Sequence, residues 1–385
     1  MRTCLFTVGL SLVATVMCVG SSFAQVDGGP PGVYQVSDLA ADVPAGQPLG
    51  TAPQYAAPQC GASPYAGTQC AGPKCAGQQC GAAPSCGWLD PNGGYCSGWT
   101  FRADGVFIQR STTRSQALFR SGFGNSSPEL LNSKTGLNFP VEVGSQVSAI
   151  RHGLCDWDIE VGYFQIDGFN ANAFQPGTSY MMTDVNGANS FIVTDASARY
   201  ISALYLGEIN VRRECLFDGL TLLAGFRMGE LDERYQAVGT GGNTPVPVIF
   251  TSSTVNHLYG FQLGADLKVF DNGGPLRVNG LCKAGAYANS INRTSQAVDT
   301  GFSDRTISAT RDQAAFMGEV GIVVSYQFTE RLAARFVYQA AWLEGVALAP
   351  EQIPNNIDFV AGTGTVDGHG GLFYHGGGAG LELKF

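Results

Sequence analysis

The feature that most constrains the fold of this chain is a period of two that recurs in ten segments after residue 97. From Trp99 to Phe107, apolar or small residues alternate with mostly polar ones. Successive side chains of a β-strand point to opposite faces, so this pattern predicts strands with one apolar face. The ten segments are approximately 98–110, 141–152, 156–167, 198–212, 219–231, 255–270, 276–289, 313–327, 332–343 and 372–385.

The connectors between these segments alternate strictly between long and short. The short ones have roughly 3 to 6 residues and the long ones roughly 23 to 30, whereas most connections in compact domains have about 4 to 6. A transmembrane barrel has this rhythm, with tight periplasmic turns on one rim, long outer loops on the other and an even number of strands. The predicted fold class is therefore all-β: a transmembrane antiparallel up-and-down β-barrel of about 10 strands, within a range of about 8 to 12.

Composition and charge support this interpretation. Only 14% of the 385 residues are charged, and 44% are hydrophobic. After the first 24 residues, however, no apolar run reaches the roughly 18 residues that a transmembrane helix requires. Strands that place apolar residues on one face account for both observations. The formal net charge of −9 leaves no basic face for nucleic acid, so we exclude nucleic acid as a partner.

Two segments of different character precede the barrel. Residues 1–24 combine Arg2, an apolar block and the small-residue pattern that ends at Ala24, which is typical of a secretory signal peptide. Residues 25–97 are rich in Gly, Pro, Ala, Gln and Cys and have no periodic apolar face, so we expect a disordered low-complexity extension on the periplasmic side. The barrel is expected to occupy residues 98–385.

The extension repeats a short Cys-centred unit. Its cysteines are Cys60, Cys70, Cys75, Cys80, Cys86 and Cys96. Their spacing fits a zinc site poorly, and oxidation is favoured outside the cytosol, so disulfides within a linker and cross-links to other envelope proteins are the two main interpretations. Cys155 and Cys215 fall near neighbouring short turns, where they could form a disulfide, stay free or pair with the extension.

The positions that alternate with the apolar face are expected to line the lumen. Their charges balance, and the predicted lumen-lining residues are Arg102, Asp104, Asp158, Glu160, Glu208, Arg227, Asp266, Lys268, Arg277, Lys283, Glu319, Arg335, Glu382 and Lys384. A ten-stranded barrel is only somewhat wider than the eight-stranded kind that side chains fill, so we expect these charges to pair across a narrow or closed lumen. Solvated charges in an open channel are the alternative.

Catalysis finds little support in the sequence. The four imidazoles are His152 at a strand end, His257 and His375 on the apolar parity, and His369 in an outer loop. None lies in the middle of the lumen beside a nucleophile, so we predict neither an enzyme nor a cofactor or metal site. The outward aromatic rings are candidates for interfacial girdles, with core packing as the alternative: Trp99, Tyr163, Tyr205, Tyr259, Tyr326, Tyr338 and Trp342.

Several stretches resemble a family of planctomycete-type outer-membrane proteins, the seventh of the beta-barrel porin families. The resembling stretches are Trp99–Ser111 (WTFRADGVFIQRS), Leu204–Arg213 (LYLGEINVRR), Leu222–Tyr235 (LLAGFRMGELDERY), Leu258–Leu267 (LYGFQLGADL) and Phe316–Pro350, which ends in YQAAWLEGVALAP. With the C-terminal strand they span nearly all of residues 97–385. The resemblance implies an outer-membrane barrel and brings no functional residues with it.

Function follows from this predicted architecture. We expect a porin-like protein of the bacterial outer membrane that passes small hydrophilic solutes by passive diffusion. The alternative is a structural or adhesive envelope protein with a closed lumen and loops, among them residues 344–371, that present a binding surface outside. The expected partners are outer-membrane lipid, the barrel assembly machinery, which would read the terminal Phe385, and other envelope proteins cross-linked through the extension.

Overall fold

The structure, a computed structural model, describes residues 98–122, 126–154, 157–182, 190–214, 219–242, 247–299, 302–353 and 364–385. All of them belong to one compact unit. The predicted signal peptide, the extension with its six cysteines, and Cys155 and Cys215 lie outside the described residues.

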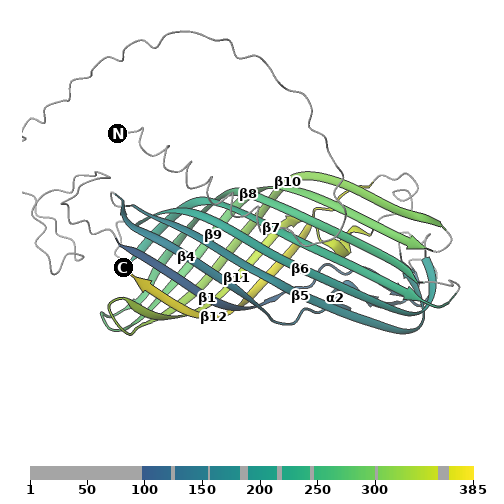
Figure 1. Cartoon of the computed structure of the whole chain (residues 1–385), viewed down its shortest axis with the longest axis horizontal. Helices are drawn as coiled ribbons and strands as arrows, with labels where there is room; N and C mark the ends of the chain where they lie inside the picture. Colours follow the sequence, from purple (N-terminus) through teal and green to yellow (C-terminus); the bar gives the residue numbers. More distant parts are fainter. Residues whose placement is uncertain are drawn as a thin grey trace, which may run out of the picture. The chain divides into compact units, whose positions relative to one another are not determined.

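Ten antiparallel strands form a closed barrel. They are β1 (Trp99–Arg110), β4 (Glu142–Leu154), β5 (Trp157–Met182), β6 (Ser190–Glu214), β7 (Leu220–Thr240), β8 (Val248–Asp271), β9 (Leu276–Asp299), β10 (Phe302–Gln327), β11 (Leu332–Val346) and β12 (Gly370–Lys384). Each strand pairs with its neighbours along the chain, and β1 pairs with β12 to close the ring. The predicted fold class and strand number are therefore confirmed, and Figure 1 shows the strands running obliquely side by side.

The two ends of the barrel sequence meet at this closing seam. The backbone N–H of Trp99 donates to the carbonyl of Phe385, and the N–H of Phe385 donates to that of Trp99. The seam is tight because β12 has glycine at successive inward positions. A Cβ at Gly376 would lie 1.9 Å from the Phe107 carbonyl oxygen, and one at Gly380 would lie 2.1 Å from that of Ala103, so only glycine fits.

A short hairpin covers an edge that the ring leaves open. Strand β5 is much longer than its neighbour β4, so its far end lacks a partner on that side. The hairpin of β2 (Ala117–Arg120) and β3 (Glu129–Asn132) supplies one, with Phe119 opposite Met181. Strand β3 leads into the short helix α2 (Ser133–Gly136). No helix in the described ranges is long and apolar enough to cross a membrane.

The strands differ from the predicted segments mainly in length. At the rim of short turns the bounds agree closely, as for β9, which begins at Leu276 in both. At the opposite rim, which we call the long-loop rim, the strands of β5 to β10 continue far beyond the predicted ends, and much of the predicted long connectors is strand. The apolar face ends there, so the alternation that identified the strands in the sequence disappears while the backbone pairing continues.

The outer wall carries an apolar belt, which consists of the outward residues of the half nearer the short turns. On β8 it runs from Tyr259 to Val269, a length that matches the roughly 9 to 11 residues a tilted strand needs to cross a bilayer core. Its exposed members include Phe101, Phe107, Val147, Tyr163, Leu222, Phe261, Leu263, Ile322, Phe336 and Leu381. Beyond the belt most outward residues are polar, as at Glu230, Ser290 and Asp312.

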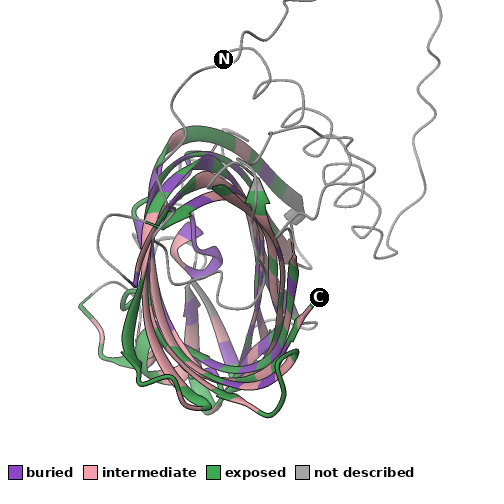
Figure 2. Ribbon diagram, turned by 90° about the vertical axis from the view of Figure 1, so that its left-hand side faces the viewer, coloured by how far each residue is buried: buried purple, intermediate pink, exposed green. Residues whose placement is uncertain are grey.

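The interior is filled differently at two levels. Inside the belt it is lined by charged and amide side chains, several of them almost fully buried. Nearer the long-loop rim it holds an apolar core, in which Tyr200, Tyr235 and Phe250 of the wall pack with residues from two connectors. One of these connectors contains the short 3₁₀ helix η2 (Ala349–Gln352), and Figure 2 shows this segment inside the ring of strands.

Candidate functional site

The first group of lumen charges is centred on Arg227 of β7. Its guanidinium contacts the carboxylate of Glu208 on β6 at 2.5 Å and that of Glu319 on β10 at 3.0 Å. Lys283 of β9 lies 2.5 Å from the other oxygen of Glu208. All four side chains are nearly buried, so each charge depends on these partners for stabilisation. Because β6 and β10 are not neighbours, the group spans the interior rather than lying along one strand pair.

A second group joins three further strands. Arg212 of β6 pairs with Glu160 of β5 and, at 3.0 Å, with Asp266 of β8. Arg212 was absent from the predicted lumen set, although it follows the inward parity of Glu208 on the same strand. The sequence therefore held the signal for Arg212, and it is the cation that balances Glu160 and Asp266.

A third group lies beside the closing seam. Arg335 of β11 contacts Asp104 of β1 and Glu382 of β12, both at 3.3 Å. Glu382 also accepts a hydrogen bond of 2.8 Å from Arg102 and lies 3.1 Å from Lys384. These contacts join the first and last strands by charge as well as by backbone hydrogen bonds.

The remaining predicted lumen residues lie at the rim of short turns. Asp158 pairs with His152 at 2.8 Å, and Arg277 lies 3.5 Å from Asp271 with a substantially exposed side chain. Lys268 is exposed beside the turn at Gly219. The structure thus places Asp158, Lys268 and Arg277 at the rim of short turns. The other eleven predicted residues belong to the three interior groups.

Asp158, His152 and Thr100 form a chain of contacts that has the order of a catalytic triad. Thr100 Oγ1 lies 2.8 Å from His152 Nε2, and His152 Nδ1 lies 2.8 Å from Asp158. A nucleophile must reach its substrate, however, and Thr100 is only 3% exposed. Thr100 also sits within the ladders that β1 forms with β4 and β12. These contacts are better explained as hydrogen bonds that stabilise the rim of short turns than as a nucleophilic site.

In the part of the interior nearer the long-loop rim, Glu233 of β7 is the centre of a fully buried polar group. Its carboxylate accepts hydrogen bonds from Arg110 (2.9 Å), Tyr200 (2.7 Å), Ser202 (3.2 Å) and the backbone N–H of Ala349 (3.0 Å). Tyr200 lies beyond the belt, and burial raises the pKa of its phenol well above the ordinary value despite the nearby Arg110. The phenol therefore stays protonated and can donate to Glu233.

The donor at Ala349 belongs to a segment that folds into the lumen. We call this segment the plug: residues 347–353 and 364–369, the described parts of the connector between β11 and β12. Asn256 of β8 binds both backbone groups of Ala347, donating to its carbonyl at 2.9 Å and accepting from its N–H at 2.8 Å. Thr254 donates to the same carbonyl at 3.0 Å.

Further inward side chains donate hydrogen bonds to the rest of the plug and to Gly345, which lies just before it in β11. Gln313 of β10 donates to the carbonyls of Gly345 (2.8 Å) and Gly368 (2.5 Å), and Asn289 of β9 donates to Gly345 at 2.9 Å. Arg293 donates to the carbonyls of Gln352 (2.7 Å) and Thr365. Because polar backbone groups inside a protein need partners, these contacts are what permit a connector to lie inside the barrel.

The plug corrects one expectation from the sequence. Residues 344–371 were expected to present a surface outside, but Ala347, Leu348 and Ala349 are fully buried and Val366 nearly so. In the described part of this connector, the exposed residues Thr365 and His369 match the expected outer position. Sequence reasoning missed Glu233, Asn256 and Arg293, although their inward parity continues that of the predicted strands.

Comparisons with known proteins add fold similarity only. No family model matches the chain, and no curated protein matches it. Among solved structures, the outer membrane protease OmpT from Escherichia coli aligns at 10% identity over 75% of this chain and 96% of that one, with a TM-score of 0.41. The toluene transporter TodX from Pseudomonas putida aligns at 13% identity over 74% and 89%, with a TM-score of 0.29. A FadL homologue from Pseudomonas aeruginosa aligns at 10% over 75% and 90%, with a TM-score of 0.26.

Proposed function

We propose that this protein is an outer-membrane β-barrel with a closed lumen, which serves the cell envelope as a structural protein and displays its long-loop rim outside. The observation that carries the proposal is the filling of the interior at two levels. Ion pairs such as Arg227 with Glu319 cross the part inside the belt, and the plug occupies the part beyond it. A general diffusion pore needs a continuous aqueous path, and the filling at these two levels favours a lumen without one.

The apolar belt supports the membrane location. Its outward rings, such as Phe261 and Leu263, would face lipid, and the short turns would lie in the periplasm. In this arrangement the partners are outer-membrane lipid, the assembly machinery that recognises the strand ending in Phe385, and envelope proteins cross-linked through the N-terminal cysteines. Membership in the planctomycete-type porin family is part of the same proposal and rests on the sequence resemblance.

Porin-like passive diffusion of small hydrophilic solutes is the second candidate. It is favoured by buried polar atoms inside the belt, the amide nitrogen of Asn210, the amide oxygen of Gln262 and the hydroxyl of Tyr287, which have no protein partner in the described part of the chain. Such atoms require water, so this level of the lumen would be hydrated. The plug is held to the wall by hydrogen bonds and apolar packing, and a displaced plug would open a path to that level.

Single-channel recording in planar bilayers distinguishes the two functions. The full chain, inserted without denaturant, is expected to show no steady conductance in the nanosiemens range, and liposomes that contain it should not swell in sugar solutions. Heat-modifiable migration in detergent gels verifies that the inserted protein is folded. Stable nanosiemens steps together with sugar uptake would replace the closed-lumen proposal with the porin.

A further inference from the structure

The outer wall beyond the belt has an unusual surface on β8, β9 and β10. The outward residues there form three rows in register across the strands, such as Ser253, Thr294 and Ser308. We call this surface the collar, and its nine residues are Thr251, Ser253, Val255, Asn292, Thr294, Gln296, Thr306, Ser308 and Thr310. Eight of the nine carry a hydroxyl or an amide, and none carries a charge.

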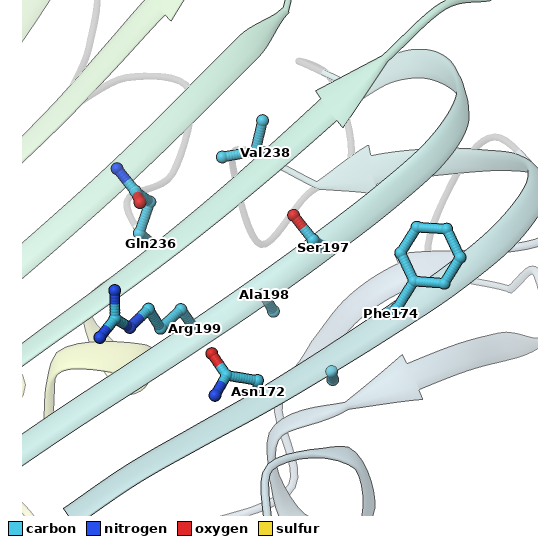
Figure 3. A pocket seen from close by; sticks show the side chains of 8 residues that line it. Asn172, Phe174, Ser197, Ala198, Arg199, Gln236 and Val238 are labelled. Atoms are coloured by element: carbon cyan, nitrogen blue, oxygen red, sulfur yellow. The ribbon is translucent and has the colours of Figure 1, made fainter.

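The collar continues onto β5, β6 and β7 as a groove. The row of Thr251 extends in register through Gln236 and Arg199 to Asn172. Figure 3 shows these last three side chains on neighbouring strands, with the ring of Phe174 at one end of the groove. The open groove has a volume of about 410 Å³, and Phe174 is 64% exposed. The guanidinium of Arg199 is steadied by a hydrogen bond of 3.3 Å to Asn170.

The position of the collar limits what can cover it. The belt row of Tyr259, Ala288 and Ala314 is followed in register by His257, Ser290 and Asp312, and the collar begins at the next row. Rows are about 6.6 Å apart and strands about 4.8 Å apart, so the collar and groove would cover roughly 13 by 24 Å of the wall. The first collar row lies two rows, about 13 Å along tilted strands, beyond the belt row of Tyr259. In a membrane, outer-leaflet headgroups and the sugars they carry reach this level.

The chemistry of the collar suits a saccharide. Hydroxyl and amide groups both donate and accept hydrogen bonds, which matches the hydroxyls of a sugar, whereas a phospholipid headgroup presents mainly charge. In the groove, Phe174 offers an apolar face for a sugar ring, and Arg199 offers donors for a phosphate on the same headgroup. A second protein copy is a poorer match, because the cores of such interfaces are enriched in aromatic and other apolar residues.

We propose that the collar and groove bind the saccharide headgroups of a glycolipid in the outer leaflet. The proposal rests on the proposed membrane location and adds a specific lipid class as partner. Bound sugars would cover the polar wall that projects beyond the belt and would fix the depth of the barrel in the membrane.

The test compares glycolipid binding by the full chain and by two valine variants. Thr294→Val, Thr306→Val and Thr310→Val together remove three collar hydroxyls while keeping β-branched side chains of equal size. The matched control is Thr178→Val, an exposed threonine on β5 outside the collar. Each protein is folded into vesicles of phosphatidylethanolamine and phosphatidylglycerol, with or without lipopolysaccharide that carries a core oligosaccharide, and the retained lipopolysaccharide is measured by native mass spectrometry after extraction.

The unaltered chain and Thr178→Val should retain lipopolysaccharide over phospholipid, and the triple variant should bind it about tenfold more weakly, as expected from the loss of one or two net hydrogen bonds. Equal retention by all three proteins, or none by the unaltered chain, overturns the collar proposal. Dimers that form without lipopolysaccharide and vanish in the triple variant would assign the surface to a second copy and also overturn it. Failure to fold into any vesicle would instead overturn the membrane location.

Discussion

At the scale of single residues, the lumen shows how buried charge is made tolerable. Glu233 has a side chain with no exposed surface, and it is stabilised because four donors from β1, β6 and the plug converge on it. Its cation, Arg110, is equally buried and lies over the ring of Phe139 at 4.5 Å. A buried pair of this kind adds little net stability over apolar packing, but removing one member leaves the other uncompensated.

Glu233→Ala is therefore expected to be strongly destabilising. It leaves the Arg110 guanidinium buried without its carboxylate, which should lower the free energy of unfolding by about 3 to 5 kcal/mol. Urea unfolding followed by tryptophan fluorescence in lipid vesicles measures this value. The control is Glu230→Gln on the same strand, whose partly exposed side chain pairs with His257 and should cost at most about 1 kcal/mol. Equal losses in the two variants would contradict the assigned role of Glu233.

At the scale of elements, the plug is a connector that behaves as part of the core. Leu348, Ala349 and Ile353 pack in the apolar cluster, and the backbone of Ala347 is bound on both sides by one asparagine side chain. Apolar burial and backbone hydrogen bonding thus hold the same short segment. The wall supplies both because β8, β9 and β10 extend beyond the belt, where their inward residues can reach a connector.

Asn256→Ala should loosen the plug without unfolding the barrel. The substitution removes two hydrogen bonds to Ala347, worth about 2 kcal/mol in total, and leaves its N–H without the Asn256 acceptor. In planar bilayers we expect brief opening events that are several-fold more frequent than in the unaltered chain. Asn292→Ala, which removes an outward asparagine from the neighbouring strand, should leave the record unchanged. If Asn256→Ala opened no more often than the control, the plug would not depend on the hydrogen bonds between Asn256 and Ala347.

At the scale of the whole molecule, one continuous sheet changes the character of both its faces at the end of the belt. Its outward face is apolar around the belt and polar beyond it, while its inward face changes from ion pairs to an apolar core and plug. The two faces thus exchange polarity along the barrel, for a physical reason. A wall surrounded by lipid can be filled with paired polar groups, whereas a wall surrounded by water needs an apolar interior to be stable.

The belt makes a prediction about insertion. Phe261→Arg places a charge at an outward position that is 75% exposed, where lipid is expected, and should reduce the stability of the folded barrel in vesicles by about 2 to 4 kcal/mol. Gln296→Arg, which lies outward beyond the belt, should cost about 0 to 1 kcal/mol. Unfolding titrations in the same vesicles compare the two. A penalty at Gln296 as large as at Phe261 would place the boundary of the lipid elsewhere.

The sequence by itself determined the strand class, the number of barrel strands and the rim of short turns. Where one face of a strand meets an apolar environment, apolar and polar residues alternate visibly in the sequence, as from Trp99 to Phe107. The same parity predicted inward positions for Glu208, Arg227, Lys283 and Glu319, which meet in one group. Parity does not say which strands face one another, so it could not assign these partners.

Only the tertiary structure decided the length of the wall, the partners of each charge and the position of the plug. Beyond the belt both faces change character, so the strands there lose the alternation that identifies them, and Arg293 and Asn256 carry no local sign of what they bind. Their ligands are backbone groups of a connector 59 to 91 residues away in the chain. The plug lies inside because closure of the barrel brings β8, β9 and β10 around it, and no pattern within the connector specifies that enclosure.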